Sequence, residues 1–128
     1  MVKRNMVILL LFIALIIGAV LEQTYVKNSI DGLQFKIEEL EKEVINDYQS
    51  QQAFNKVEEI RIYWHEREKV LSVFINYKEL KEIVVQISRL QQTMWQAERE
   101  NTFIELTVLK NIASSTEKVI GFNFQNII

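Results

Sequence analysis

Residues 6–21 read MVILLLFIALIIGAVL and contain no charged or strongly polar side chain. The run follows Lys3 and Arg4 and is closed by Glu22. Hydrocarbon offers backbone amides no hydrogen-bond partners, so such a run is expected to be helical, and at ~1.5 Å per residue it covers about 24 Å. Neighbouring positions can lengthen this helix. The sequence therefore predicts a transmembrane anchor that contacts membrane lipid over residues 5–26.

A cleaved secretory signal peptide and a buried helix of a soluble protein share parts of this pattern. A signal peptide needs small residues around its cleavage site, whereas Ile17-Gly18-Ala19 places a branched residue at the first key position. The chain has no cysteine, so it can carry neither a lipid-modified cysteine nor a disulfide framework. We favour an uncleaved anchor over both of these readings.

The charges that flank the anchor predict its orientation, because basic residues near a span tend to stay in the cytoplasm. Lys3 and Arg4 precede the span, while Lys27 follows it only after an acidic residue. We expect residues 1–27 to form a cytoplasmic stub and a single-pass anchor in the cell membrane. Residues 28–128 would then form a helical domain outside the cytoplasm, with a short apolar C-terminal tail.

The part of the chain after the anchor is acidic and carries scattered charges of both signs. The fifteen Lys and Arg of the chain, less Lys3 and Arg4, leave thirteen against seventeen Asp and Glu, a formal charge of −4. Basic residues alternate with carboxylates, as in residues 66–69 (EREK). A nucleic-acid surface needs a clustered positive field, so no nucleic-acid partner is expected.

The composition and the spacing of apolar residues predict an all-α fold. The chain has no proline and only three glycines, and apolar side chains recur at helical spacing in four blocks. Short connections make successive helices antiparallel, in a closed bundle or in stacked helical hairpins. The expected helices cover residues 32–47, 51–75, 77–99 and 103–119. The predicted core consists of Leu40, Val57, Ile60, Trp64, Leu71, Phe74, Ile83, Ile87, Leu90, Leu106 and Leu109.

Capping chemistry predicts where these helices begin. Asp31, Asn76 and Thr102 each stand three residues before a Gln or Glu that can reach back, and Ser50 is a candidate cap for the second helix. In the first case Ile30 would pack on Phe35 as a hydrophobic staple. Gly121 is expected to end the last helix. The apolar tail that follows would fold back on the bundle or on the membrane, and the sequence leaves that choice open.

Some apolar residues form a second stripe, distinct from the predicted core. We favour central packing of this stripe, and we keep open the alternative that it faces a partner protein. Trp95 lies at the edge of its stripe, where a core boundary competes with a partner contact. The candidate partner-facing residues are Ile62, Val70, Val73, Trp95, Ile104, Val108 and Ile112.

Nothing in the sequence predicts catalysis. The sole histidine, His65, stands beside Trp64 and so points to the flank of its helix, and no phosphate loop, nucleophile elbow or di-iron motif is present. We therefore expect no catalytic, metal-binding or cofactor-binding residues. Arg67 lies on the apolar stripe between Trp64 and Leu71, where it should pair with a glutamate of another helix.

Several segments resemble a known family. Residues 37–41 (IEELE), Trp64, residues 88–90 (SRL) and residues 126–128 (NII) match its Glu-rich first helix, the tryptophan of the second, part of the third and its ending. The chain resembles an uncharacterised family of short membrane-anchored helical proteins from spore-forming Gram-positive bacteria, the domain of unknown function 4363 type. The resemblance implies no activity, and it implies a genomic neighbourhood of multi-pass membrane proteins. The chain departs from the family at Asn76-Tyr77, where the family carries Asp-His, so no proton or metal chemistry is transferred.

These features together favour an anchored interaction or scaffold protein, an accessory subunit of a membrane or envelope complex, and a homo-oligomer stays open. One alternative is a division-type bitopic coiled-coil protein, which would continue a single heptad helix out of the membrane, whereas Asp31-Gly32 and Asn76 are expected to break this one. A second alternative is a helical domain that binds lipid or a small ligand. A hydrolase or a metal-dependent enzyme fits the sequence less well.

Overall fold

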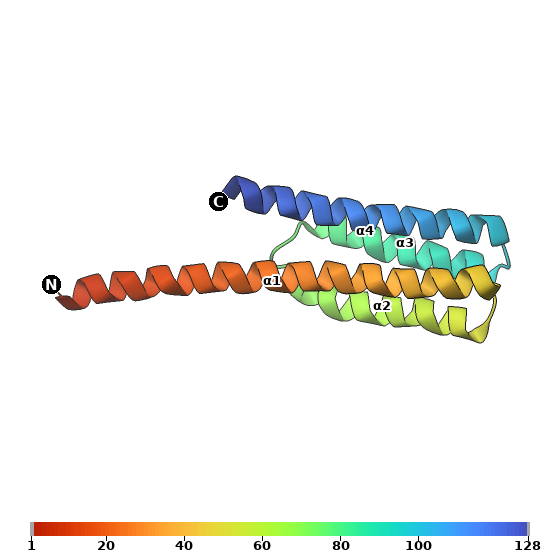
Figure 1. Cartoon of the computed structure of the whole chain (residues 1–128), viewed down its shortest axis with the longest axis horizontal. Helices are drawn as coiled ribbons and strands as arrows, with labels where there is room; N and C mark the ends of the chain where they lie inside the picture. The colour runs from red at the N-terminus through yellow and green to blue at the C-terminus, as the bar shows by residue number, and fades with distance from the viewer. Residues whose placement is uncertain (1, 128) are drawn as a thin grey trace.

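A computed structural model of the chain contains four α-helices (Figure 1). The structure describes the backbone of residues 2–127 and the side chains of residues 3–118. The helices are α1 (Val2–Asp47), α2 (Gln51–Leu71), α3 (Tyr77–Trp95) and α4 (Arg99–Ile127). The described residues contain no strand, so the predicted all-α fold is confirmed.

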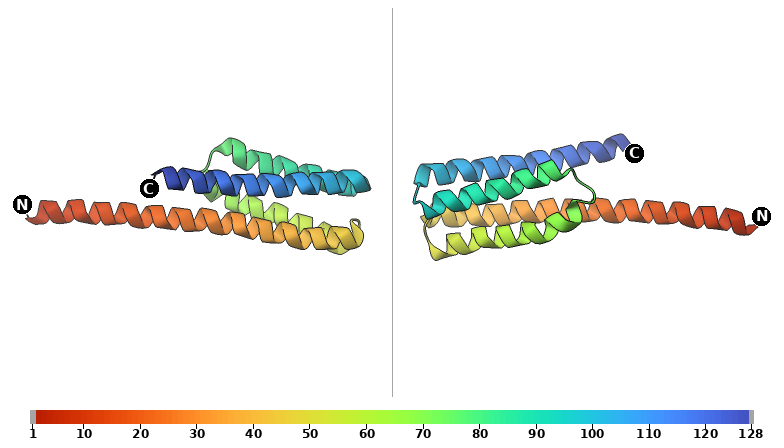
Figure 2. Two further views of the ribbon diagram at one scale, coloured as in Figure 1. Left: turned by 45° about the horizontal axis from the view of Figure 1, so that its top comes forward. Right: turned by 180° about the vertical axis from the view of Figure 1, so that it is seen from behind.

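The helices form a closed up-and-down bundle. Each helix packs against the next along the chain, and α1 also packs against α4, which closes the ring (Figures 1 and 2). The stacked-hairpin alternative is therefore wrong. Residues 6–21 of α1, which we call the stem, project from one end of the bundle. We call this the stem end; the α1–α2 and α3–α4 connections lie at the far end.

Helix α1 runs through the predicted break without interruption. Asp31 and Gly32 lie inside it, so the expected helix start at residue 32 and the expected Asp31 cap are both wrong. Phe35 is 62% exposed, so the predicted staple with Ile30 is wrong too. Apolar side chains on both sides of Asp31 pack into the same core, and this tertiary packing overrides the local preference for a turn.

Two of the other predicted caps are confirmed. The Ser50 hydroxyl accepts a hydrogen bond from the Ala53 amide at 3.1 Å, and the Asn76 side chain accepts one from the Lys78 amide at 3.1 Å. The third is wrong, because Thr102 lies within α4 and donates its hydroxyl to the Glu98 carbonyl.

The ends of the later helices differ from the expected ones. Helices α2 and α3 stop four residues early, and the α3–α4 corner turns through Ala97, whose φ of 58° lies in the left-handed region. Gly121 does not end α4, which continues to Ile127. Glycine ends helices when it adopts a left-handed conformation, and none of the described glycines has positive φ. The packing of the tail side chains, residues 122–128, lies outside the described residues.

One apolar core runs through the bundle. Trp64 is 1% exposed at its centre, and its indole nitrogen donates to the Leu80 carbonyl at 3.3 Å. Ten of the eleven predicted core residues are buried. The exception is Phe74, which is 41% exposed because α2 ends at Leu71 and leaves it in the α2–α3 connection.

The stem differs from the rest of α1. Its side chains are exposed, and it lies in the one described helix that is long and apolar enough to cross a membrane. The bundle core begins at Val26, which is buried. The predicted domain boundary after residue 27 therefore falls inside a continuous helix, and nothing in the backbone separates stem from bundle.

Candidate interaction surfaces

The candidate partner-facing residues, which comprise the second apolar stripe and Trp95, lie mostly outside the core. Six are exposed, and Ile112 is half-buried, so the favoured expectation of central packing is wrong. In a closed ring each helix turns one stripe to the centre, and a second stripe must point elsewhere. The six exposed residues are Ile62, Val70, Val73, Trp95, Ile104 and Val108.

These residues do not form a single surface. Ile104, Val108 and Ile112 share one face of α4, whereas Val73 lies in the α2–α3 connection. Trp95, at the far end of α3, is 79% exposed and forms a T-shaped pair with the Phe54 ring, with 6.4 Å between ring centroids. It is a surface residue rather than a core boundary.

Two of the α4 residues, Val108 and Ile112, line a groove between α3 and α4, with a cavity of about 680 Å³. Val85 of α3 joins Val108 and Ile112 as its apolar lining, and charged side chains stand around them. The lining residues are Tyr77, Lys78, Lys81, Glu82, Val85, Gln86, Arg89, Val108 and Ile112. Val85 and Tyr77 are both exposed, and neither was singled out from the sequence. Val85 could have been noticed as an apolar residue off the stripe that carries Ile83 and Ile87.

A smaller hollow of about 290 Å³ continues this groove along α4. It shares Glu82, Val108 and Ile112 with the groove and adds Glu79, Asn111, Ser115 and Thr116. The outward residues Ile104, Val108, Asn111 and Ser115 are exposed and uncharged, and two of them are branched apolar residues. This face of α4 therefore differs from an ordinary solvated helix surface.

A buried amide fixes the two helices that form the groove. Gln86 of α3 is buried, and its side-chain nitrogen donates to the Glu105 carbonyl of α4 at 2.9 Å and to the Glu105 carboxylate. Because a buried amide without partners costs ~1–3 kcal/mol, this pairing favours one relative position of α3 and α4.

Arg67 occupies a different environment from the one predicted. Its guanidinium carbon lies 5.2 Å from the ring centroids of both Tyr25 and Tyr63, and Nη1 donates to the Ser29 hydroxyl at 3.3 Å. Two aromatic rings thus replace the expected glutamate of another helix. Pairing with rings is available because guanidinium is planar and weakly hydrated.

The same two helices meet closely at Gly32. The Tyr63 hydroxyl donates to the Ser29 carbonyl at 2.9 Å, and a Cβ at Gly32 would lie 2.3 Å from the Tyr63 oxygen. Gly32 therefore makes room for the ring rather than for a turn. Burial raises the pKa of Tyr63, and the charge of Arg67 opposes that rise. We call Tyr25, Ser29, Gly32, Tyr63 and Arg67 the arginine–tyrosine cluster.

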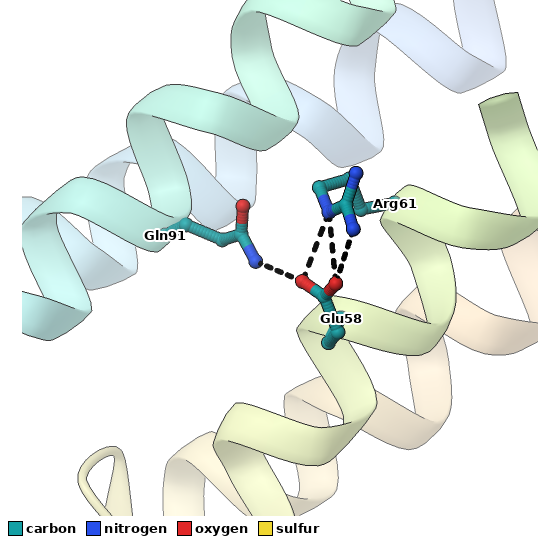
Figure 3. Close-up of polar contacts among 3 residues, drawn as sticks. All are labelled: Glu58, Arg61 and Gln91. Atoms are coloured by element: carbon teal, nitrogen blue, oxygen red, sulfur yellow. Dashed lines mark hydrogen bonds and ion pairs between the residues drawn. The ribbon is translucent and has the colours of Figure 1, made fainter.

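A second polar group joins α2 to α3 (Figure 3). Arg61 Nε donates to both carboxylate oxygens of Glu58, at 3.0 and 2.9 Å, and Gln91 Nε2 donates to Glu58 Oε2 at 2.8 Å. Hydrogen bonds from Arg61, and then from Gln91, lower the pKa of Glu58 to about 2. We call these three residues the Glu58 network.

No candidate metal centre occurs among the described residues. No group of three or more His, Cys, Asp and Glu side chains in that part of the chain could hold a metal ion, and His65 is exposed. The Glu58 carboxylate accepts from Arg61 and Gln91, which is the role of an ion-pair partner.

The fold and its surfaces define a class of protein: a closed four-helix bundle that carries an apolar N-terminal stem and, between its last two helices, a groove lined by apolar and charged side chains. The chain belongs to the family described as a domain of unknown function (DUF4363), which matches residues 20–127. The match covers the bundle and only the last two residues of the stem. Neither the curated proteins nor the solved structures contain a match to the chain.

Proposed function

We propose that the chain is a single-pass membrane protein whose extracytoplasmic bundle binds a helix of another membrane or envelope protein. The exposed stem lies in a helix that is long and apolar enough to cross a membrane, which supports the anchoring. Lys3 and Arg4 before the stem support a cytoplasmic N-terminus. In this role the chain is a non-catalytic accessory subunit or scaffold.

The α3–α4 groove is the observation that carries the binding role. Val85 and Val108 expose branched apolar side chains in it, and the exposed α4 residues beside it, Ile104, Asn111 and Ser115, carry no charge. Apolar anchors at helical spacing on a groove of this kind suit an amphipathic helix.

The charges around the groove indicate what that helix should carry. Lys78, Lys81 and Arg89 are exposed on α3 along the groove, against one exposed carboxylate there, Glu82. A partner helix with an apolar stripe and acidic flanking residues would match both features. We therefore propose an acidic amphipathic helix as the occupant of the groove.

One observation supports the coiled-coil alternative and another argues against it. Helix α1 does continue from the stem into the domain, as that alternative requires. However, its heptad-like apolar residues Leu33, Ile37, Leu40 and Val44 are buried within this chain's own bundle. A helix whose apolar stripe is already covered offers no seam to a second chain.

The test compares two double variants of the full-length protein. In the first, Ile104→Gln and Val108→Asn make the groove side of α4 polar. In the matched control, Ile62→Gln and Val70→Asn change two similarly exposed residues on α2. Both variants should keep the helical circular dichroism signal and the melting temperature of the unchanged protein.

A photo-crosslinking amino acid at Val85 would identify the partner and the segment that contacts the groove. We expect the crosslinked segment to be an acidic amphipathic helix, and we expect the α4 variant to lose this partner while the α2 variant keeps it. Retention of the partner by both variants would refute the groove as its binding site.

A further inference from the structure

We propose that the stem end of the bundle rests on the lipid headgroups of the membrane that the stem crosses. The contact surface is a rim of exposed apolar side chains, Val70, Val73, Phe74 and Tyr77, at the end of α2 and the start of α3. This inference rests on the proposed anchoring and adds a second membrane contact to it.

The register of α1 and α2 gives the position of the rim along the bundle axis, relative to the end of the stem. Arg67 bonds to Ser29, and in an antiparallel pair each step along one helix is matched by a step back along the other. Leu71, the last residue of α2, therefore falls beside Tyr25. The connection that follows falls beside residues 20–24, where the stem ends.

Helix α4 also runs to the stem end, on the other side of the bundle. Gln34 Nε2 donates to Glu117 Oε2 at 3.0 Å, and α4 continues from Glu117 to Ile127 toward the stem. The α2–α3 connection and the C-terminal end of α4 both lie at the stem end, and α4 reaches further along the stem than the connection does (Figures 1 and 2).

The level of the α2–α3 connection along α1 corresponds to the headgroup layer. The layer is about 5–8 Å thick on each side of the hydrocarbon, so an apolar run that ends at Leu21 places the next turn of α1 within it. Because α1 has no break between stem and bundle, the bundle cannot swing freely away from that height.

The rim has the chemistry of an interfacial surface. Val73 is 76% exposed, although it is apolar and lies in a connection between helices, where exposed residues are usually polar. Of the charged residues within two positions of the rim in sequence, Lys69 and Lys78 are exposed whereas Glu68 and Glu79 are half-buried.

The orientation of one further lysine fits the same surface. The Lys81 ammonium lies 5.7 Å from the centroid of the Tyr77 ring, so this lysine extends toward the rim. Apolar side chains flanked by lysines suit an interface with anionic headgroups.

The test places one fluorescent label at a time on the full-length chain, which has no cysteine of its own. Val73→Cys and Tyr77→Cys report on the rim, Gln52→Cys on the far end, and Ile13→Cys on the stem. Each labelled variant is reconstituted into vesicles of phosphatidylcholine and phosphatidylglycerol that carry a nitroxide either on the headgroup or deep in the acyl chain.

We expect headgroup nitroxides to quench most of the fluorescence at Val73 and Tyr77 and to leave Gln52 unchanged. Deep nitroxides should quench Ile13. If both rim labels behave like Gln52 while Ile13 is quenched, the rim inference is overturned and the anchoring stands. An unquenched Ile13 label would instead overturn the anchoring, and the rim inference with it.

Discussion

Helix α2 carries two arginines, six positions apart, in regions of opposite character. Arg61 belongs to the exposed Glu58 network and pairs with a carboxylate one turn away on its own helix. Arg67 belongs to the arginine–tyrosine cluster, where it is half-buried between two rings from different helices. The first pairing is local and readable from sequence spacing. The second depends on how α1 and α2 pack, so only the structure reveals it.

The two regions should also differ in what they contribute to stability. Groups in the cluster are desolvated and closely packed, so their loss should be costly. Groups in the Glu58 network are screened by water, and exposed ion pairs are worth only ~0.2–1 kcal/mol. Unfolding of full-length variants in mild detergent would measure this difference.

Gly32→Ala should have the largest effect. The new methyl group would lie 2.3 Å from the Tyr63 oxygen, so the ring must move and give up its bond to Ser29. Overpacking of this kind costs ~1–3 kcal/mol, more than the usual helical gain from alanine.

Gly18→Ala is the matched control, because nothing lies within 4 Å of a Cβ at that position. It should leave stability unchanged or slightly raised. If both alanine variants melted alike, the close approach of Tyr63 to α1 would be refuted. A partial rescue of Gly32→Ala by Tyr63→Phe would attribute the clash to the hydroxyl.

Arg67→Met should come next. The change introduces an apolar side chain of similar length and removes the two cation–π contacts. We expect the free energy of unfolding to fall by about 1–2 kcal/mol. Arg67→Lys should recover only part of it, since an ammonium cannot stack on both rings. Arg61→Met in the exposed network should cost clearly less. Equal losses at the two arginines would contradict the distinction between the regions.

Tyr63→Phe removes one hydrogen bond and leaves the ring in place. The Ser29 carbonyl would lose a donor, and we expect unfolding to become easier by about 1 kcal/mol, the usual value of such a bond. Hydrogen exchange at α1 amides near Ser29 should increase, while exchange in α4 should not. An increase that spread evenly over the bundle would mean that Tyr63 does not act locally.

Much of the fold follows from the sequence, because the bundle core rests on helical periodicity. The stripe that includes Leu40, Ile60, Ile83 and Leu106 was predicted from spacing alone, and all four are buried. The two confirmed caps, Ser50 and Asn76, have an equally local cause. Such features depend on neighbours within one helical turn.

The errors all concern choices that depend on tertiary packing. Asp31-Gly32 is typical of a turn, but packing on both sides keeps α1 helical, and Gly32 instead accommodates Tyr63. Phe74 fits the core stripe only if α2 continues past Leu71. Whether the second stripe is buried depends on which helices become neighbours, and the ring closed by α1 and α4 leaves it outside.

Glu58→Gln should have the smallest effect, and its dependence on pH is the sharpest test of the network. The folded pKa of about 2 lies below the ordinary value of 4.5, so the folded state favours the carboxylate. The stability that this carboxylate contributes is therefore fully present above about pH 4.5 and is lost as the pH falls through about 2. Because the side chain is 42% exposed, we expect a loss of only about 0.5 kcal/mol for the glutamine variant at pH 7. Urea unfolding of both proteins at several pH values between 7 and 2 would measure this difference, which should shrink toward zero at the acid end. A difference that stayed constant down to pH 2 would show that Glu58 acts through packing and not through its charge.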